Sequence, residues 1–285
     1  MARGLRARGW HHGRMSRSTF ATHTARVNDT QLAYTDEGQG RAVVLLHGHG
    51  YDRSMWDAQI PVLVDQGWRV VTPDLRGFGE SEVTPGIVYT EEFAADVIAL
   101  LDHLGLDSVV LVGFSMAGQV ALQIVATHPE RVAALIVNDT VPHAEDVAGR
   151  RRRHVGADGI LTGGMPAYAD RVLASMIHED NVERLPEVAR AVREMIAACP
   201  AEGAAAAMRG RAERQDFTET LRAWRKPALV VVGDGDAFDG GAARRMAELL
   251  PHGELAVVPR SGHTPNMENP ADYDAALLRF LGSLT

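Results

Sequence analysis

The chain has 285 residues, of which 46% are hydrophobic and 23% charged, with a formal net charge of −8. This is enough for a large core in one α/β domain with an insertion. The acidic balance argues against a nucleic-acid partner, whose binding surface is normally basic. Cys199 is the single cysteine, which excludes an intrachain disulfide, and no apolar run approaches the roughly 18 residues of a membrane span. We therefore expect a cytoplasmic protein with neither nucleic acid nor a membrane as partner.

The N-terminal segment differs in composition from the rest of the chain. It has six arginines and no acidic residue through Asn28, and it lacks the apolar stretch of a secretory signal. We expect residues 1–24 to form a disordered extension, with the folded domain beginning near Ala25. Met15 is a candidate for the natural first residue.

The main part of the chain alternates between strand-like and helix-like patterns. The predicted strands are Gln31–Asp36, Ala42–Leu46, Arg69–Thr72, Ser108–Val112, Ala134–Val137, Ala228–Val232 and Glu254–Val258. Several are continuous apolar runs, which is typical of parallel strands covered on both faces. The predicted helices are Ser54–Gln66, Tyr89–Leu104, Met116–His128, Gly241–Leu250 and Pro270–Leu281. This order predicts an α/β fold with a mostly parallel, doubly wound sheet.

One long segment interrupts the alternation. No strand is predicted from Pro142 to Arg225, where alanine, glutamate and arginine dominate. Because strands precede and follow it, we interpret residues 142–225 as a helical cap inserted into a core of residues 25–141 and 226–285. The alternative is a separate helical domain.

The strongest local signal for chemistry surrounds Ser115. An apolar strand leads into Gly113-Phe114-Ser115-Met116-Ala117-Gly118, and a helical pattern follows. A serine on such a tight strand-to-helix turn projects its hydroxyl above the sheet, and the helix N-terminus favours negative charge nearby. Ala117 stands where glycine is usual, and Gly118 follows. The alternative is a serine in an ordinary turn.

Three other segments follow predicted strands at positions suited to the same site. They are His47-Gly48-His49-Gly50, Gly233-Asp234-Gly235-Asp236 and Ser261-Gly262-His263. Each alone is compatible with ordinary turn chemistry. Together they give the order serine, acid, histidine, which is the order of a nucleophile-elbow triad.

With these segments, the chain resembles the α/β-hydrolase superfamily from about residue 30 onward. The similar stretches are His47–Gly50, Pro73–Ser81, Gly113–Gly118, Gly233–Asp236 and Gly262-His263. The resemblance implies the α/β-hydrolase fold with a helical cap after the sixth strand. Within the superfamily the chain looks most like the 3-oxoadipate enol-lactonase and carboxylesterase branch, through Met55–Gln59, Pro129–Val132, Asn138–Thr140, Gly164-Met165 and, more loosely, Ala204–Arg211.

The resemblance implies a role for each site residue. Ser115 is expected to be the nucleophile, His263 its general base and later acid, and Asp236 the acid that orients the imidazole. The backbone N–H groups of His49 and Met116 are expected to form the oxyanion hole.

Other acids and pocket residues remain open. Asp139 is the alternative acid, because some family members carry the acid after the preceding strand, and Asp234 competes locally. Candidate pocket residues are His49, Met165, Trp224 and Phe238, with ordinary core packing as the alternative. Asp74 and Arg76 are expected to be structural, Glu268 to anchor the loop after His263, and Arg150–Arg153 to form a solvated helix face.

The sequence contains no phosphate-binding loop, zinc motif or dinucleotide fingerprint, so we expect neither metal nor cofactor. The predicted activity is hydrolysis of a small-molecule carboxylic ester or lactone, such as an enol-lactone, through an acyl-enzyme. One alternative keeps the triad for C–C bond hydrolysis, perhydrolysis or biosynthetic tailoring. Another is a ligand receptor or signalling protein with slow turnover. The oligomeric state is unknown.

Overall fold

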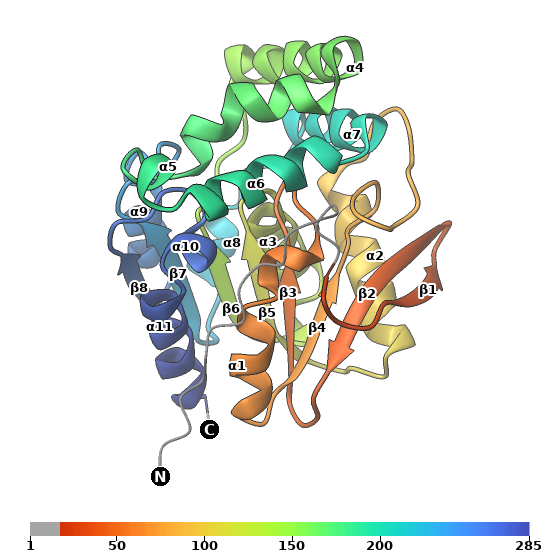
Figure 1. Cartoon of the computed structure of the whole chain (residues 1–285). Helices are drawn as coiled ribbons and strands as arrows, with labels where there is room; N and C mark the ends of the chain where they lie inside the picture. The colour runs from red at the N-terminus through yellow and green to blue at the C-terminus, as the bar shows by residue number, and fades with distance from the viewer. Residues whose placement is uncertain (1–17, 285) are drawn as a thin grey trace.

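A computed structural model describes residues 18–284, which form a three-layer α/β structure around one sheet (Figure 1). The eight strands lie in the order β1-β2-β4-β3-β5-β6-β7-β8. The β1–β2 and β2–β4 pairs are antiparallel, and all other pairs are parallel. The strands are β1 (His23–Val27), β2 (Thr30–Glu37), β3 (Ala42–Leu46), β4 (Arg69–Pro73), β5 (Val109–Phe114), β6 (Val132–Asn138), β7 (Ala228–Gly233) and β8 (Gly253–Val258).

Helices cover both faces of the sheet and explain its apolar strands. The front face in Figure 1 carries α1 and α11, whereas α2, α3, α8 and α9 pack on the other face. All residues of β3, β5 and β7 are consequently buried. The helices are η1 (Arg53–Trp56), α1 (Gln59–Asp65), α2 (Thr90–His103), α3 (Met116–Thr127), η2 (Pro129–Arg131), α4 (Val147–Met176), α5 (Asn181–Arg184), α6 (Pro186–Ala198), α7 (Ala201–Ala212), α8 (Thr218–Ala223), α9 (Ala242–Leu249), α10 (Pro265–Glu268) and α11 (Pro270–Gly282).

The strand register brings the chemically interesting loops to one edge of the sheet. Leu46 of β3 pairs with Gly113 of β5, and Phe114 pairs with Asn138 of β6. Farther along the sheet, Gly233 of β7 pairs with Val258 of β8. The loops that follow these parallel strands therefore leave side by side, at the carboxyl edge where open α/β sheets bind ligands.

The folded part begins earlier than the sequence predicts. Strand β1 starts at His23, and already Ser18 Oγ and Thr19 N donate hydrogen bonds to Asp57. The expected boundary at Ala25 is therefore too late. The prediction missed β1 because it is a short edge strand with mostly exposed residues. Residues 1–17, with most of the expected extension and Met15, lie outside the described part of the chain.

The insertion between β6 and β7 is helical, as predicted, but shorter than expected. Helices α4–α7 lie beyond the carboxyl edge of the sheet (Figure 1), and the amide of Phe217 donates to Pro142 O at 2.8 Å where the two ends of the insertion meet. Helix α8 instead packs against α3 and α9 beside the sheet. The expected cap boundary at Arg225 is thus wrong, because α8 already belongs to the covering layer of the core.

The longest helix of the insertion has a sharp bend. Within α4, Gly164 has φ 78° and ψ 164°, and Pro166 follows two residues later. Glycine adopts a positive φ at little steric cost, and Pro166 lacks an N–H that the first turn of a new helix would leave without an acceptor, so the second half of α4 starts in a new direction.

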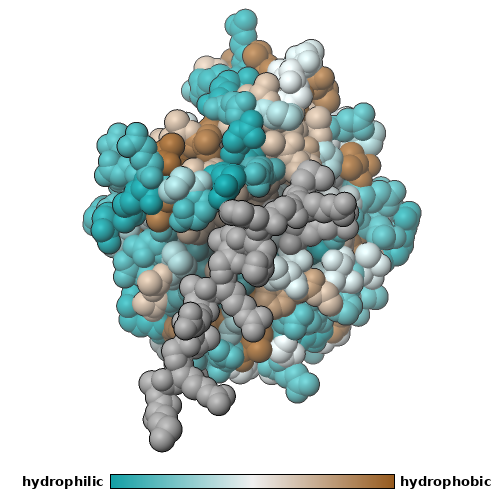
Figure 2. Space-filling view, in the orientation of Figure 1, coloured by the Kyte–Doolittle hydropathy of each residue, from teal (hydrophilic) through white to brown (hydrophobic). Residues whose placement is uncertain are grey.

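The surface is mixed in polarity. Figure 2 shows hydrophobic residues in small groups among hydrophilic ones on the visible face. Among the helices formed by residues 18–284, none is long and apolar enough to cross a membrane.

Candidate functional site

Ser115 occupies the tight turn between β5 and α3. Its backbone has φ 52°, a left-handed conformation that non-glycine residues rarely adopt. Thr140 Oγ1 donates to Ser115 O at 2.7 Å, and Ser115 N donates to Asn138 O at 2.8 Å. These bonds to β6 and the loop after it hold the turn in place.

Two glycines make this turn sterically possible. A Cβ at Gly113 would lie 2.3 Å from Ala117 O, and one at Gly118 would lie 2.6 Å from the Thr140 side chain. The unusual Ala117 is fully buried without such a conflict of its own. Small residues are therefore needed at 113 and 118, and alanine fits at 117.

The structure brings Ser115, His263 and Asp236 together from three separate loops. His263 Nε2 lies 2.9 Å from Ser115 Oγ, and His263 Nδ1 lies 3.0 Å from Asp236 Oδ1. The imidazole is 5% exposed and the Asp236 side chain 1%. This is the arrangement in which a histidine takes a proton from serine while a carboxylate fixes its tautomer.

The histidine loop is anchored by Glu268, as the sequence predicts. Glu268 Oε1 accepts hydrogen bonds from the amides of Gly262 and Thr264, on either side of His263. Its other oxygen accepts from His178 N at 2.8 Å and Asn181 Nδ2 at 2.7 Å, two residues of the insertion. One buried carboxylate thus ties the insertion to the loop that carries His263.

The two competing acids have other positions. Asp234 Oδ1 accepts from Ser261 N at 3.2 Å and so braces the loop before the histidine. Asp139 Oδ1 accepts from Gly233 N at 3.0 Å, and its Oδ2 is buried without a partner. Burial, and then the charge of Asp236, raise the pKa of Asp139 well above its ordinary value. Asp139 therefore lies beside the site with its charged form disfavoured, whereas Asp236 contacts the imidazole.

Potential metal-ligand atoms of Asp139, Asp236 and His263 lie within 4.8 Å of one another, close enough to share a cation. For His263 Nε2 to accept the serine proton, the neutral ring must carry its proton on Nδ1. In that tautomer Nδ1 has no lone pair for a metal. The donor set therefore fits the hydrogen-bonded triad better than it fits a cation.

The loop after β3 approaches the nucleophile closely. A Cβ on Gly48 would lie 3.2 Å from Ser115 Cβ and 2.7 Å from the Phe114 ring, so only glycine fits. The next amide, that of His49, follows this close approach directly. Met116 begins α3, where amides have no acceptor within the helix. The predicted oxyanion donor of Met116 is therefore next to Ser115 in the chain, and that of His49 follows the residue that approaches Ser115 in space.

The two histidines of this loop fix its shape. His47 Nδ1 lies 2.8 Å from Gly48 O, while its Nε2 accepts from Leu75 N at 2.9 Å. His49 Nε2 lies 2.8 Å from Ala204 O in the insertion. Burial is the main reason that the pKa values fall to about 4 for His47 and about 3 for His49. Both rings are therefore neutral at pH 7 and serve as hydrogen-bonding supports.

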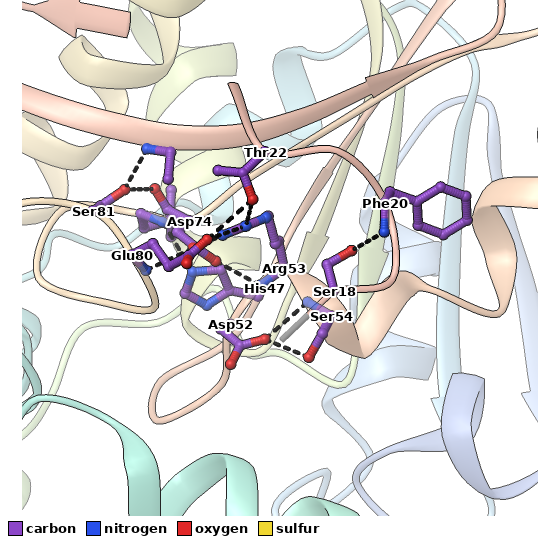
Figure 3. Close-up of polar contacts among 12 residues, drawn as sticks. Ser18, Phe20, Thr22, His47, Asp52, Arg53, Ser54, Asp74, Glu80 and Ser81 are labelled. Atoms are coloured by element: carbon purple, nitrogen blue, oxygen red, sulfur yellow. Dashed lines mark hydrogen bonds and ion pairs between the residues drawn. The ribbon is translucent and has the colours of Figure 1, made fainter. Parts of the chain in front are cut away.

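A polar network fixes the same loop from the side of β4 (Figure 3). Asp74 accepts from the backbone amide of Arg53 at 2.7 Å and from Glu80 N at 2.8 Å, and the Arg53 guanidinium bonds to both acids. Arg76 forms a bidentate pair with Asp96, at 2.7 Å for each bond. The structural roles predicted for Asp74 and Arg76 are thus confirmed.

The predicted pocket residues separate into different places. The ring of Phe238 is half exposed and lies 4.8 Å from the His263 ring. The ring of His49 packs between Phe78 and Tyr168, and Met165 is buried within the insertion.

Trp224 is wrong as a pocket residue. Its ring lies against Lys226, whose Nζ donates to Val132 O at the start of β6, the sheet edge opposite Ser115. Its indole N–H donates to Pro227 O at 3.4 Å. Sequence proximity to the insertion suggested a pocket position, but α8 carries this residue down the side of the sheet.

Comparison with known proteins agrees with this geometry. The family model described as "alpha/beta hydrolase fold" matches residues 41–270, and the chain belongs to this family. The fold class and enzyme class predicted from the sequence are therefore confirmed.

Individual relatives span most of the chain. A thermophilic esterase from Thermogutta terrifontis superimposes with a TM-score of 0.89 at 36% identity, covering 93% of this chain and 99% of the esterase. The enol-lactonase from Burkholderia xenovorans LB400 gives 0.84 at 28% identity, covering 91% and 100%. A putative non-heme chloroperoxidase from Synechocystis sp. is 30% identical over 88% of this chain and 94% of its own length.

Proposed function

We propose that the protein is a cofactor-independent serine hydrolase that cleaves a carboxylic ester or lactone through an acyl-enzyme. The observation that carries the proposal is the chain of two hydrogen bonds from Ser115 Oγ through His263 to Asp236. Similarity to an esterase and to an enol-lactonase supports ester or lactone substrates.

The proposed first half-reaction forms an ester on Ser115. Its Oγ attacks the carbonyl carbon while His263 Nε2 takes the hydroxyl proton. The resulting oxyanion accepts hydrogen bonds from the backbone amides of His49 and Met116. When the intermediate collapses, His263 gives its proton to the leaving oxygen. A simple ester then releases an alcohol, whereas a lactone keeps the new hydroxyl on its acyl chain.

The second half-reaction returns the enzyme to its starting state. A water molecule gives its proton to His263 and attacks the acyl carbonyl, and Ser115 leaves with the proton that His263 returns to it. Asp236 keeps the imidazole oriented and stabilises its cationic form throughout. No step needs a metal or a redox group, and helices α4–α7 act as a cap that shapes the pocket.

Perhydrolysis is the second candidate, favoured by the similarity to a chloroperoxidase. In that reaction hydrogen peroxide replaces water in attacking the acyl-enzyme, and a peracid replaces the free acid as product. C–C bond hydrolysis and a receptor role with slow turnover share the same triad.

One panel tests these proposals. We expect steady-state turnover of p-nitrophenyl esters and of an enol-lactone by the wild type. Loss of about 10⁴-fold or more is expected in Ser115→Ala, as for other triads that lose a member. Peracid formed from acetate and peroxide would favour the second candidate, and turnover of only a ring-fission product would favour C–C hydrolysis. A single turnover per protein with every substrate would contradict an enzyme role.

A further inference from the structure

A partly buried arginine of the insertion contacts the helix that follows the nucleophile. Arg211 stands in the last turn of α7, and its Nε donates to Gln119 Oε1 at 3.2 Å. Gln119 follows Ser115 by four residues on α3, and residues four apart share one face of a helix. The hydrogen bond therefore places the guanidinium beside the first turn of α3, which begins directly after Ser115.

Arg211 has no acidic partner. Among residues 18–284 no carboxylate forms an ion pair with its guanidinium, and Gln119 Oε1 is the one hydrogen-bond acceptor found for it. Glu145, an acid close enough to act on the pKa of Arg211, is already bonded to Arg153 and Arg214. Three neighbouring guanidinium groups thus share one carboxylate, which leaves an excess of positive charge.

This charge excess has an energetic cost in the free protein. Burial is the largest effect that lowers the pKa of Arg211 well below its ordinary value, and repulsion by Arg153 and Arg214 adds to it. A partly buried charge without a counter-ion loses hydration that no partner replaces. An anionic group of a ligand would remove this cost.

The side chain is nevertheless partly accessible. Arg211 has intermediate exposure, so part of it is open to a ligand. Its charge contributes to lowering the pKa of His49, the residue of the oxyanion loop. The ring of Tyr168 lies 5.9 Å from the His49 ring and also lines an open cavity of about 780 Å³.

That cavity is basic although the whole chain is acidic. It is lined by Arg151, Arg152, Arg153 and Arg171, with Glu145 as the single acid among its lining residues. A cleft lined with one sign of charge raises the local concentration of the opposite charge. The surface around Tyr168, whose ring contacts His49, therefore favours anions.

We propose that Arg211 binds a carboxylate of the substrate, so that the preferred substrates are esters or lactones that carry a free carboxylate group. The free Nη groups offer two parallel donors, which match the two oxygens of a carboxylate. The proposal rests on the proposed hydrolysis at Ser115. It adds that the substrate carries a carboxylate in addition to its reacting carbonyl.

Matched ester pairs test this. Ethyl hydrogen glutarate carries the carboxylate, and ethyl 4-nitrobutanoate replaces it by a neutral nitro group of the same shape. Monoethyl succinate and adipate vary the distance. We expect wild type to prefer a charged ester by about 100-fold in kcat/KM, mostly through KM, because the neutral ester cannot form the charge-assisted pair in binding. In Arg211→Met this preference should fall to about 1.

A second measurement separates binding from chemistry. In the Ser115→Ala background, calorimetric titration with ethyl hydrogen glutarate should detect binding that disappears when Arg211→Met is added. Arg222→Gln removes an exposed arginine of α8 and should keep the wild-type preference. Thermal unfolding of Arg211→Met should match or exceed that of wild type, because an unpaired charge is removed.

The outcomes distinguish the two proposals. If neither wild type nor Arg211→Met distinguished charged from neutral esters, the carboxylate role would be overturned and the hydrolase activity would stand. The same preference in both proteins would assign the selectivity to another residue and would also overturn it. Absence of turnover with every ester, together with Arg211-dependent binding, would instead overturn hydrolysis at Ser115.

Discussion

Charged side chains at the carboxyl edge of the sheet and in the helical insertion differ in the partners that the fold gives them. At the edge, Asp236 and Glu268 each meet donors that the backbone places for them. In the insertion, Arg211 is partly buried and forms no ion pair with an acid of residues 18–284. Acids held by donors within the fold suit chemistry that stays the same, whereas a cation without an acidic partner suits a group that the substrate brings. The comparison suggests that the edge determines the reaction and the insertion determines its selectivity.

The edge is most sharply tested by its two neighbouring acids. Asp236→Asn should lower kcat/KM by about 10⁴-fold, because an amide favours the wrong imidazole tautomer. Asp139→Asn is the matched control and should lower it by about threefold at most, because Asp139 Oδ1 bonds to Gly233 N and Asp236 remains the partner of the imidazole. Steady-state kinetics with one ester measures both. The reverse ranking would make Asp139 the triad acid.

The link between the two regions is tested by Glu268→Gln. A glutamine side chain has one oxygen in place of the two of Glu268, and its NH₂ group cannot accept. It therefore loses either the bonds from Gly262 and Thr264 or those from the insertion. We expect a loss of about 2 kcal/mol in the free energy of unfolding and about tenfold in kcat/KM. Urea denaturation and the same ester assay measure these effects.

Glu248→Gln, on the exposed face of α9, is the control for Glu268. It should change neither quantity. Unaltered stability in Glu268→Gln would mean that the insertion is held to the histidine loop by other contacts.

Acidic pH should weaken the contact between the oxyanion loop and the insertion. His49 has a pKa of about 3 in the folded protein, below the ordinary 6.5, so folding requires its neutral form. The associated stability is complete above pH 6.5 and is lost as the pH falls toward 3, at about 1.4 kcal/mol per pH unit. His47, with a pKa of about 4, acts in the same direction.

His49→Gln tests this pH dependence. From pH 6 to pH 5 the free energy of unfolding should fall by about 1 kcal/mol less in His49→Gln than in wild type. The exposed His103→Gln should keep the wild-type slope. Urea denaturation at a series of pH values measures the slope, and equal slopes for His49→Gln and wild type would exclude His49 as a source.

The same two regions differ in how far the sequence predicts them. The central strands were found because they are continuous apolar runs, and Ser115, Asp236 and His263 were expected to meet because each lies in a loop after a predicted strand. The edge strand β1 lacks that pattern, since only its inward residues are buried. The division between insertion and core was misplaced at α8, and Trp224 with it, because helical composition does not say which layer a helix joins.

Arg211 shows a second limit of prediction from the sequence. It is one of many arginines in the chain, and the sequence gives no reason to separate it from Arg150–Arg153. Its position became informative only when folding placed it against Gln119 with no ion pair to an acid among residues 18–284. Burial and partner count are properties of packing, which local patterns do not contain.

The central claim is that Ser115 is the nucleophile, and covalent labelling tests it most directly. Wild-type protein incubated with a fluorophosphonate should gain one adduct by intact-mass spectrometry, located on the peptide that contains Ser115. Ser115→Ala should gain none under the same conditions. Stoichiometric labelling of Ser115→Ala, or an adduct on another serine in the wild type, would contradict the account.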